Sequence, residues 1–227
     1  MTALMVIGMI CAVCLIEYIR TKKSKQKELI LVKSRENFLR GRISPAEFEI
    51  PRGFFFSPNH LWLKILPCGD VEIGMDDFTQ KIIGKFDKIE IKNKKRVKKG
   101  EDLFTVYQNN KKLTFYSPVE GRISEINKEI LENPDLLRNS IYEKGWILKI
   151  TPFELQDLIR ETNIDKNAYK WFLKEIEKLE DFLTSHNISN KPAFSTLQDG
   201  KIKIEGLLEN FDDFAWMDFE EKFLKRR

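Results

Sequence analysis

Histidine and cysteine are the side chains that most often act as bases, nucleophiles or metal ligands near neutral pH, and this chain of 227 residues has only two His and three Cys. No serine or cysteine with a second partner lies near His60, so we expect a structural histidine beside Trp62. Cys11 and Cys14 fall in an apolar stretch and Cys68 stands alone. This pattern gives neither a disulfide framework nor a four-ligand zinc site. We therefore predict no catalytic residues, no metal and no enzyme.

A pair of neighbouring carboxylates, Asp76 and Asp77, has the residue types of an acid and base pair. They open a segment, residues 76–84, that has apolar residues at helical spacing and ends on a glycine. Acidic residues at the start of a helix interact favourably with its dipole. We interpret the pair as the start of a short capped helix.

Residues 103–118 predict a β-hairpin whose tip is followed by two lysines. Asn109 and Asn110 accept the positive φ that a tight turn demands, and Lys111 and Lys112 come next. We expect the tip to be polar and exposed. Alternating apolar residues define the two arms: Phe104, Val106, Leu113 and Phe115.

Short strands separated by turns surround this hairpin. Apolar residues at strand spacing occur in residues 71–73, 89–91, 123–126 and 146–150, with glycines between them. This order predicts a mainly β sandwich or barrel over residues 53–152, and not alternating βα units. The chain has no phosphate-cradling glycine loop.

The chain opens with an apolar segment, residues 2–19, whose single charge is Glu17. As a helix it would extend about 27 Å, nearly the hydrocarbon thickness of a bilayer. Basic residues 20–27 follow it, whereas a cleaved signal peptide carries its positive charge before the apolar run. Because such residues stay on the cytoplasmic side, we predict a transmembrane anchor over 1–20 and a charged linker over 21–52. The protein is then a single-pass cell-membrane protein whose body is cytoplasmic.

Positive and negative charges are interspersed along the chain. The net charge is +4 although 33% of the residues are charged, and no basic stripe with interleaved aromatics stands out. We therefore do not expect nucleic acid as a partner. Two basic runs stand out. The run at 20–27 can also bind anionic headgroups. The run at 92–100 is either a solvated loop tip or a site for an acidic partner.

Residues 153–227 predict a helical extension with a short hairpin. Asp165 can cap an amphipathic helix, Pro192 and the turn at 199–200 set a hairpin, and a last helix begins at about Asp212. The last helix is rich in aromatic residues. It either docks a partner or the membrane interface, or folds back on the preceding helix, which we favour.

Three motifs around the hairpin resemble the H protein of the glycine cleavage system. They are Ser-Pro-Val-Glu-Gly at 117–121, the Asn-Pro segment at 132–139 and Tyr-Glu-Lys-Gly-Trp at 142–146; His60 and Trp62, just before a strand, add to the likeness. The resemblance implies a lipoyl-like barrel-sandwich hybrid domain. It also implies a lysine at the hairpin tip that carries lipoic acid as an amide, a swinging arm that serves partner enzymes.

By the same resemblance, the position of the family's lipoyl lysine falls on Asn110, which has no amine to acylate. Tyr107 stands where the family has an acidic residue. Two hypotheses follow. The first is a membrane-tethered protein-interaction module, an adaptor without a cofactor. The second is a working carrier with lipoic acid on Lys111. In both, the partners are the membrane, through the N-terminal helix, and proteins of a membrane-associated complex or carrier pathway.

Overall fold

The computed structural model describes residues 17–18, 22, 43–92, 94–186 and 203–225. Most of the predicted anchor over 1–20, most of the linker and most of the predicted hairpin near 199–200 lie outside these residues. Within the described part, no helix is both long and apolar enough to cross a membrane.

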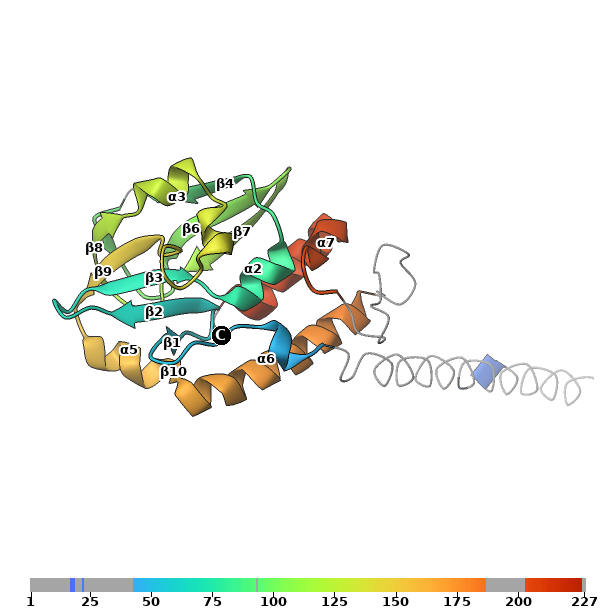
Figure 1. Ribbon diagram of the computed structural model, residues 1–227. Coiled ribbons are helices and arrows are strands. Elements are labelled where there is room, and N and C mark those ends of the chain that lie inside the picture. Colours follow the sequence, from blue (N-terminus) through green and yellow to red (C-terminus); the bar gives the residue numbers. More distant parts are fainter. Residues whose placement is uncertain (1–16, 19–21, 23–42, 93, 187–202, 226–227) are drawn as a thin grey trace, which may run out of the picture.

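Two antiparallel sheets build the body (Figure 1). The larger has the order β10-β1-β2-β3-β9-β8-β5, and the smaller has the order β4-β6-β7. This arrangement confirms the prediction of a mainly β body with helices after it. The strands are β1 (Phe55–Phe56), β2 (Leu61–Ile65), β3 (Val71–Met75), β4 (Lys88–Ile91), β5 (Arg96–Val97), β6 (Asp102–Gln108), β7 (Lys111–Tyr116), β8 (Gly121–Ile126), β9 (Leu148–Pro152) and β10 (Asn163–Ile164).

The predicted hairpin is confirmed as β6 and β7. Gln108 pairs with Lys111, which leaves the two asparagines as the turn, and Asn109 has φ 53°. Phe104 and Phe115 stack with ring centroids 4.8 Å apart. Alternation along the arms thus buries one face of the hairpin in the core.

Short helices connect the strands as the sequence predicts. α2 (Asp77–Ile83) is capped by Asp76, whose carboxylate accepts from the backbone N–H of Thr79 at 2.9 Å. Gly84 ends the helix with φ 80°, a conformation that favours glycine. α3 (Lys128–Glu132) leads into the Asn-Pro segment and α4 (Leu136–Asn139) ends it, and η1 (Pro45–Glu47) precedes the body.

Two motif glycines lie where a side chain has no room. A Cβ on Gly121 would stand 2.5 Å from the Cγ2 of Ile150, and one on Gly145 would collide with the carbonyl group of Ile141. These motifs therefore mark close backbone packing.

The extension follows β9 and packs on the body (Figure 1). Asp165 starts its long helix but has φ 49° and does not cap it; the N-cap position is Ile164. The last helix folds back on this long helix, as expected, with Phe182 and Phe219 centroids 5.8 Å apart. Its apolar residues join the core of the body rather than a separate one. The elements are α5 (Leu155–Glu161), α6 (Asp165–Ser185), η3 (Leu207–Asn210), α7 (Asp213–Phe219) and a π-helical turn, η4 (Glu220–Leu224).

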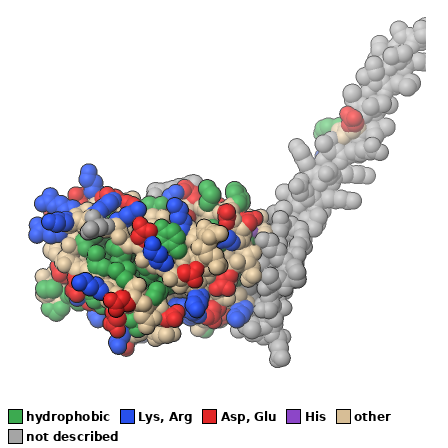
Figure 2. All heavy atoms as spheres, turned by 90° about the horizontal axis from the view of Figure 1, so that it is seen from above, with side chains coloured by type: hydrophobic (Ala, Val, Ile, Leu, Met, Phe, Trp, Pro, Cys, Tyr) green, Lys and Arg blue, Asp and Glu red, His purple; other side chains and the backbone are tan. Residues whose placement is uncertain are grey.

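Charge is unevenly distributed over the surface. Figure 2 shows lysine and arginine side chains gathered at the left-hand end of the body, beside an area of hydrophobic side chains. In Figure 1 this end holds β8, β9 and the turn between β2 and β3, whereas α7 lies at the other end.

Candidate functional site

The tip of the β6–β7 hairpin is exposed but anchored. Asn109 and Asn110 are both exposed, and the backbone N–H of Asn109 donates to the Asp87 carboxylate at 2.6 Å. The predicted lipoyl position, Asn110, thus presents a neutral amide to solvent. An amide nitrogen is not the nucleophilic amine that lipoic acid needs, so the group does not fit at this residue.

Lys111 and Lys112 point to different surroundings, as successive residues of a strand do. Lys112 is exposed, whereas Lys111 is half-buried. The ammonium group of Lys111 donates to the backbone carbonyl of Phe211 and lies 5.7 Å from the ring centroid of Trp216. The amine of Lys111, which the sequence suggested as the substitute attachment point, is therefore hydrogen-bonded to the extension.

Glu220 of η4 covers the outer edge of β7. One carboxylate oxygen accepts from the backbone N–H of Thr114 at 3.0 Å and the other from the hydroxyl of Tyr116 at 2.9 Å. Burial and the nearby Glu220 raise the pKa of Tyr116 well above its usual value, so the hydroxyl stays a donor. Unpaired N–H groups on an edge strand can pair with another chain, and here Glu220 of the extension accepts from one of them, that of Thr114.

Gln108 and Glu209 tie the base of the turn to α2 and η3. The Gln108 amide donates to the carbonyl of Ile83 at 3.1 Å and to a carboxylate oxygen of Glu209 at 3.3 Å. The backbone N–H of Lys85 donates to the same Glu209 oxygen at 3.3 Å. The hairpin is thus held by the extension from its turn to the far end of β7.

His60 lies fully buried between two carboxylates. Its Nδ1 is 2.7 Å from Asp76 and its Nε2 is 3.3 Å from Glu175 of α6. Burial alone lowers the pKa of His60, but the charges and hydrogen bonds of Asp76 and Glu175 outweigh it and raise the pKa to about 9. A protonated imidazole therefore links the residue before β2 to α6 near neutral pH.

The aromatic neighbours of His60 differ from the predicted one. Its ring stacks on Phe78, 4.4 Å between centroids, and lies 5.1 Å from Trp171. The ring neighbours of Trp62 are Phe54 and Tyr142. His60 is therefore buried in the core as expected, but it packs against α2 and α6 and not against Trp62.

Two roles were not foreseen from the sequence. Asp76 uses one oxygen as the helix cap and the other for His60. Glu175 lies next to Ile176 in the buried stripe of α6, although it is charged. The sequence did contain a signal for the contact: Glu175 stands among apolar residues on one face of the helix, and a buried carboxylate needs a cation as its partner.

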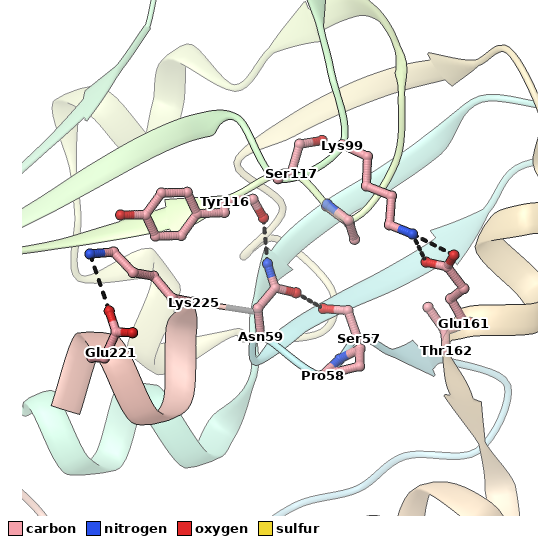
Figure 3. A pocket seen from close by; sticks show the side chains of 12 residues that line it. Ser57, Pro58, Asn59, Lys99, Tyr116, Ser117, Glu161, Thr162, Glu221 and Lys225 are labelled. Carbon is pink, nitrogen blue, oxygen red and sulfur yellow. Dashed lines mark hydrogen bonds and ion pairs between the residues drawn. The ribbon is translucent and has the colours of Figure 1, made fainter. Parts of the chain in front are cut away.

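A cavity of about 540 Å³ lies between the body and the extension (Figure 3). On one side Lys99 pairs with Glu161, and on the other Lys225 lies 3.4 Å from Glu221. Between them, the Asn59 amide donates to the carbonyl of Tyr116 at 2.5 Å. The charged side chains compensate one another in pairs, so the cavity shows no preference for an anion or a cation.

The described residues contain no group of three His, Cys, Asp or Glu side chains that could hold a metal ion. The exposed Cys68 lies in the turn before β3. Cys11 and Cys14 fall outside the described ranges.

Comparison with known proteins extends the likeness beyond the hairpin. The sequence model of the family described as Glycine cleavage H-protein matches residues 54–176, which run past Pro152 into α6. The probable glycine cleavage system H protein of Pyrococcus furiosus is 32% identical over 135 residues, which are 59% of this chain and 99% of that protein. The glycine cleavage system H protein of Halothermothrix orenii is 30% identical over 130 residues, 56% of this chain and 98% of that protein.

A crystal structure of a glycine cleavage system H protein from Mycobacterium marinum aligns with a TM-score of 0.46 and 19% identity. It covers 56% of this chain and 98% of that one. The family match alone takes in more than half of the 227 residues. This chain therefore belongs to the glycine cleavage H-protein family.

Proposed function

We propose that this chain is an H-protein-like adaptor that is not lipoylated and binds other proteins at the cytoplasmic face of the cell membrane. H proteins carry a group between enzymes and are not themselves catalytic. An adaptor of this kind would still bind partner proteins, as a carrier does, but would have no lipoyl arm.

One observation carries this proposal: the extension holds the hairpin that would bear the arm. The tip residue is Asn110, and the ammonium of Lys111 donates to the carbonyl of Phe211, which lies between η3 and α7 in the chain. Acylation of Lys111 would remove its charge, leave its nitrogen a single N–H and add a long chain at the point where the nitrogen contacts the extension. Glu220 further fixes β7, so the whole arm of the hairpin is engaged.

Membrane attachment rests on the sequence. Residues 2–19 are long and apolar enough to span a bilayer, and the basic run at 20–27 favours a cytoplasmic body. Alkaline carbonate extraction of host membranes tests this: we expect the full chain to stay in the pellet and a chain lacking residues 1–20 to be released. Release of the full chain would contradict the anchor.

The alternative function is a lipoyl carrier. Its support is the family itself and the amine of Lys111, one residue beyond the family's position, with the exposed Lys112 directly after it. On this hypothesis an attaching enzyme accepts a lysine displaced from the tip. A lysine moved along a strand by one residue points to the other face, which weakens the hypothesis for Lys111.

Acylation by a lipoate–protein ligase distinguishes the two functions. The full chain, purified in detergent, is incubated with the ligase, ATP and lipoic acid, and intact mass is measured. Lys111→Arg and Lys112→Arg remove each amine with charge kept, and Asn110→Lys restores the family's residue. The H protein of Pyrococcus furiosus serves as the positive control for the ligase.

We expect no lipoyl adduct on the natural chain while the control is fully modified. An adduct on Asn110→Lys alone would show that the missing amine is the decisive difference. An adduct on the natural chain that disappears in Lys111→Arg or Lys112→Arg would refute the adaptor and establish the carrier.

A further inference from the structure

The outer edge of β8 is only partly covered. β8 pairs with β9 along its length, but on the other side β5 pairs only with Gly121 and Arg122. The backbone N–H of Ile123 adds one bond to the Lys95 carbonyl at 3.1 Å. From Ser124 to Ile126, the described residues provide no strand on this side. A sheet edge of this kind can accept another extended chain.

A groove of about 640 Å³ runs beside this open edge. Its apolar part comes from Ile123, Ile126 and Trp146, all half-buried. Lys149 covers the Trp146 ring at 4.5 Å and pairs with Glu125 at 2.9 Å. The groove thus offers apolar side chains and backbone groups of β8 that no described strand pairs on this side, and the charge of its carboxylate, Glu125, is compensated by Lys149.

The rim of the groove is positively charged. Lys95 and Lys128 line it, are exposed, and have no ion-pair partner among the described residues. Lys94 also lines it but is compensated by Glu101 at 2.5 Å and Asp102 at 2.9 Å. Figure 2 shows the lysines and arginines of this end beside hydrophobic side chains. A negatively charged ligand fits this rim.

Lysines at a sheet edge and a bulge also keep proteins from pairing with their own copies. Such a bulge lies between Ile123 and Glu125. Repulsion of this kind acts against a second copy of the same positive edge. It does not act against a strand of opposite charge, so the same lysines select for the partner.

We propose that the β8 groove binds an extended acidic segment of a partner protein, which adds as a strand beside residues 124–126. Its alternate residues differ in chemistry: carboxylates face Lys95 and Lys128, and apolar side chains contact Ile126 and Trp146.

The position of the groove suits a tethered protein. The described body begins at Ile43, whose N–H donates to Glu180 near the C-terminal end of α6. That end and α7 lie opposite β8 in Figure 1. The groove therefore faces away from the attachment point, and this proposal stands whether or not a lysine is lipoylated.

A designed peptide tests the proposal on the full chain in detergent micelles. The probe is a fluorescein-labelled peptide of alternating Glu and Val, and a peptide of alternating Lys and Val is its control. Binding is followed by fluorescence anisotropy and by amide hydrogen exchange at residues 124–126. The double variant Lys95→Glu with Lys128→Glu reverses the rim, and Lys166→Glu with Lys170→Glu makes the same change on exposed α6 residues.

We expect the Glu-Val peptide to bind and to slow exchange at 124–126. The rim variant should weaken binding of the Glu-Val peptide by about tenfold, because it replaces two favourable surface ion pairs by two like-charge contacts. The α6 variant should leave binding unchanged. Four results would overturn the proposal: no binding at millimolar peptide, equal binding of the Lys-Val peptide, equal loss in the α6 variant, or binding without protection at 124–126. Protection of these amides by self-association of the chain would instead assign the edge to a second copy.

Discussion

The buried pair of carboxylates around His60 makes the stability of the fold depend on pH in the alkaline range. The pKa of His60 is about 9 in the folded chain and 6.5 when unperturbed. A group whose pKa is raised by folding stabilises the fold fully below its unfolded pKa. That contribution is lost as the pH rises through the folded value. The window of loss is therefore about pH 6.5 to 9.

The size of the effect follows from the two pKa values. Their difference is about 2.5 pH units, and each unit corresponds to about 1.4 kcal/mol, so the charge of His60 contributes about 3–4 kcal/mol to stability. Glu175 remains its partner over this range. Burial alone would raise the pKa of Glu175, but the bonds to His60 and Lys178 outweigh it and lower that pKa. Deprotonation of His60 then leaves the buried Asp76 without its cation and Glu175 with Lys178 as its remaining cation.

Urea unfolding of the full chain in detergent, followed by tryptophan fluorescence, measures this contribution at pH 5.5, 7.5 and 9.5. His60→Gln is the matched control, because its amide is polar but does not titrate. We expect the free energy of unfolding of the natural chain to exceed that of the variant at pH 5.5. The difference should shrink by about 3 kcal/mol by pH 9.5. A difference that does not change with pH would refute the charged state of His60.

Three further perturbations follow from the packing. Glu220→Gln removes the charged acceptor on β7 and should cost about 1–2 kcal/mol, with faster amide exchange at Thr114; unchanged exchange there would contradict the contact. Gly145→Ala forces a Cβ against the Ile141 carbonyl and should lower the melting temperature measured by circular dichroism, whereas an unchanged melt would show that the turn has room. Phe223→Ala empties a fully buried site and should cost about 3–5 kcal/mol in urea unfolding; a cost below about 1 kcal/mol would place η4 outside the core.

Local patterns predicted much of the fold. Alternation and the two asparagines gave the hairpin, and Asp76 and Gly84 gave the ends of α2, because these signals act over a few residues. The helical spacing likewise gave α6 and α7.

The contacts that shape the site are long-range, and no local period encodes them. His60 meets Glu175 across 115 positions, and Thr114 meets Glu220 across 106. The sequence placed Lys111 near an exposed tip but gave no sign that Phe211 would cover it. Only the packing of the extension on the body brings these residues together.

The mass of the protein made in its own host tests the central claim most directly. The full chain is purified from host membranes, and both its intact mass and the mass of the peptide containing residues 109–112 are measured. We predict an unmodified hairpin on a chain recovered from the membrane fraction. A lipoyl group on Lys111 or Lys112 in that protein would contradict the adaptor and show that the carrier function is retained.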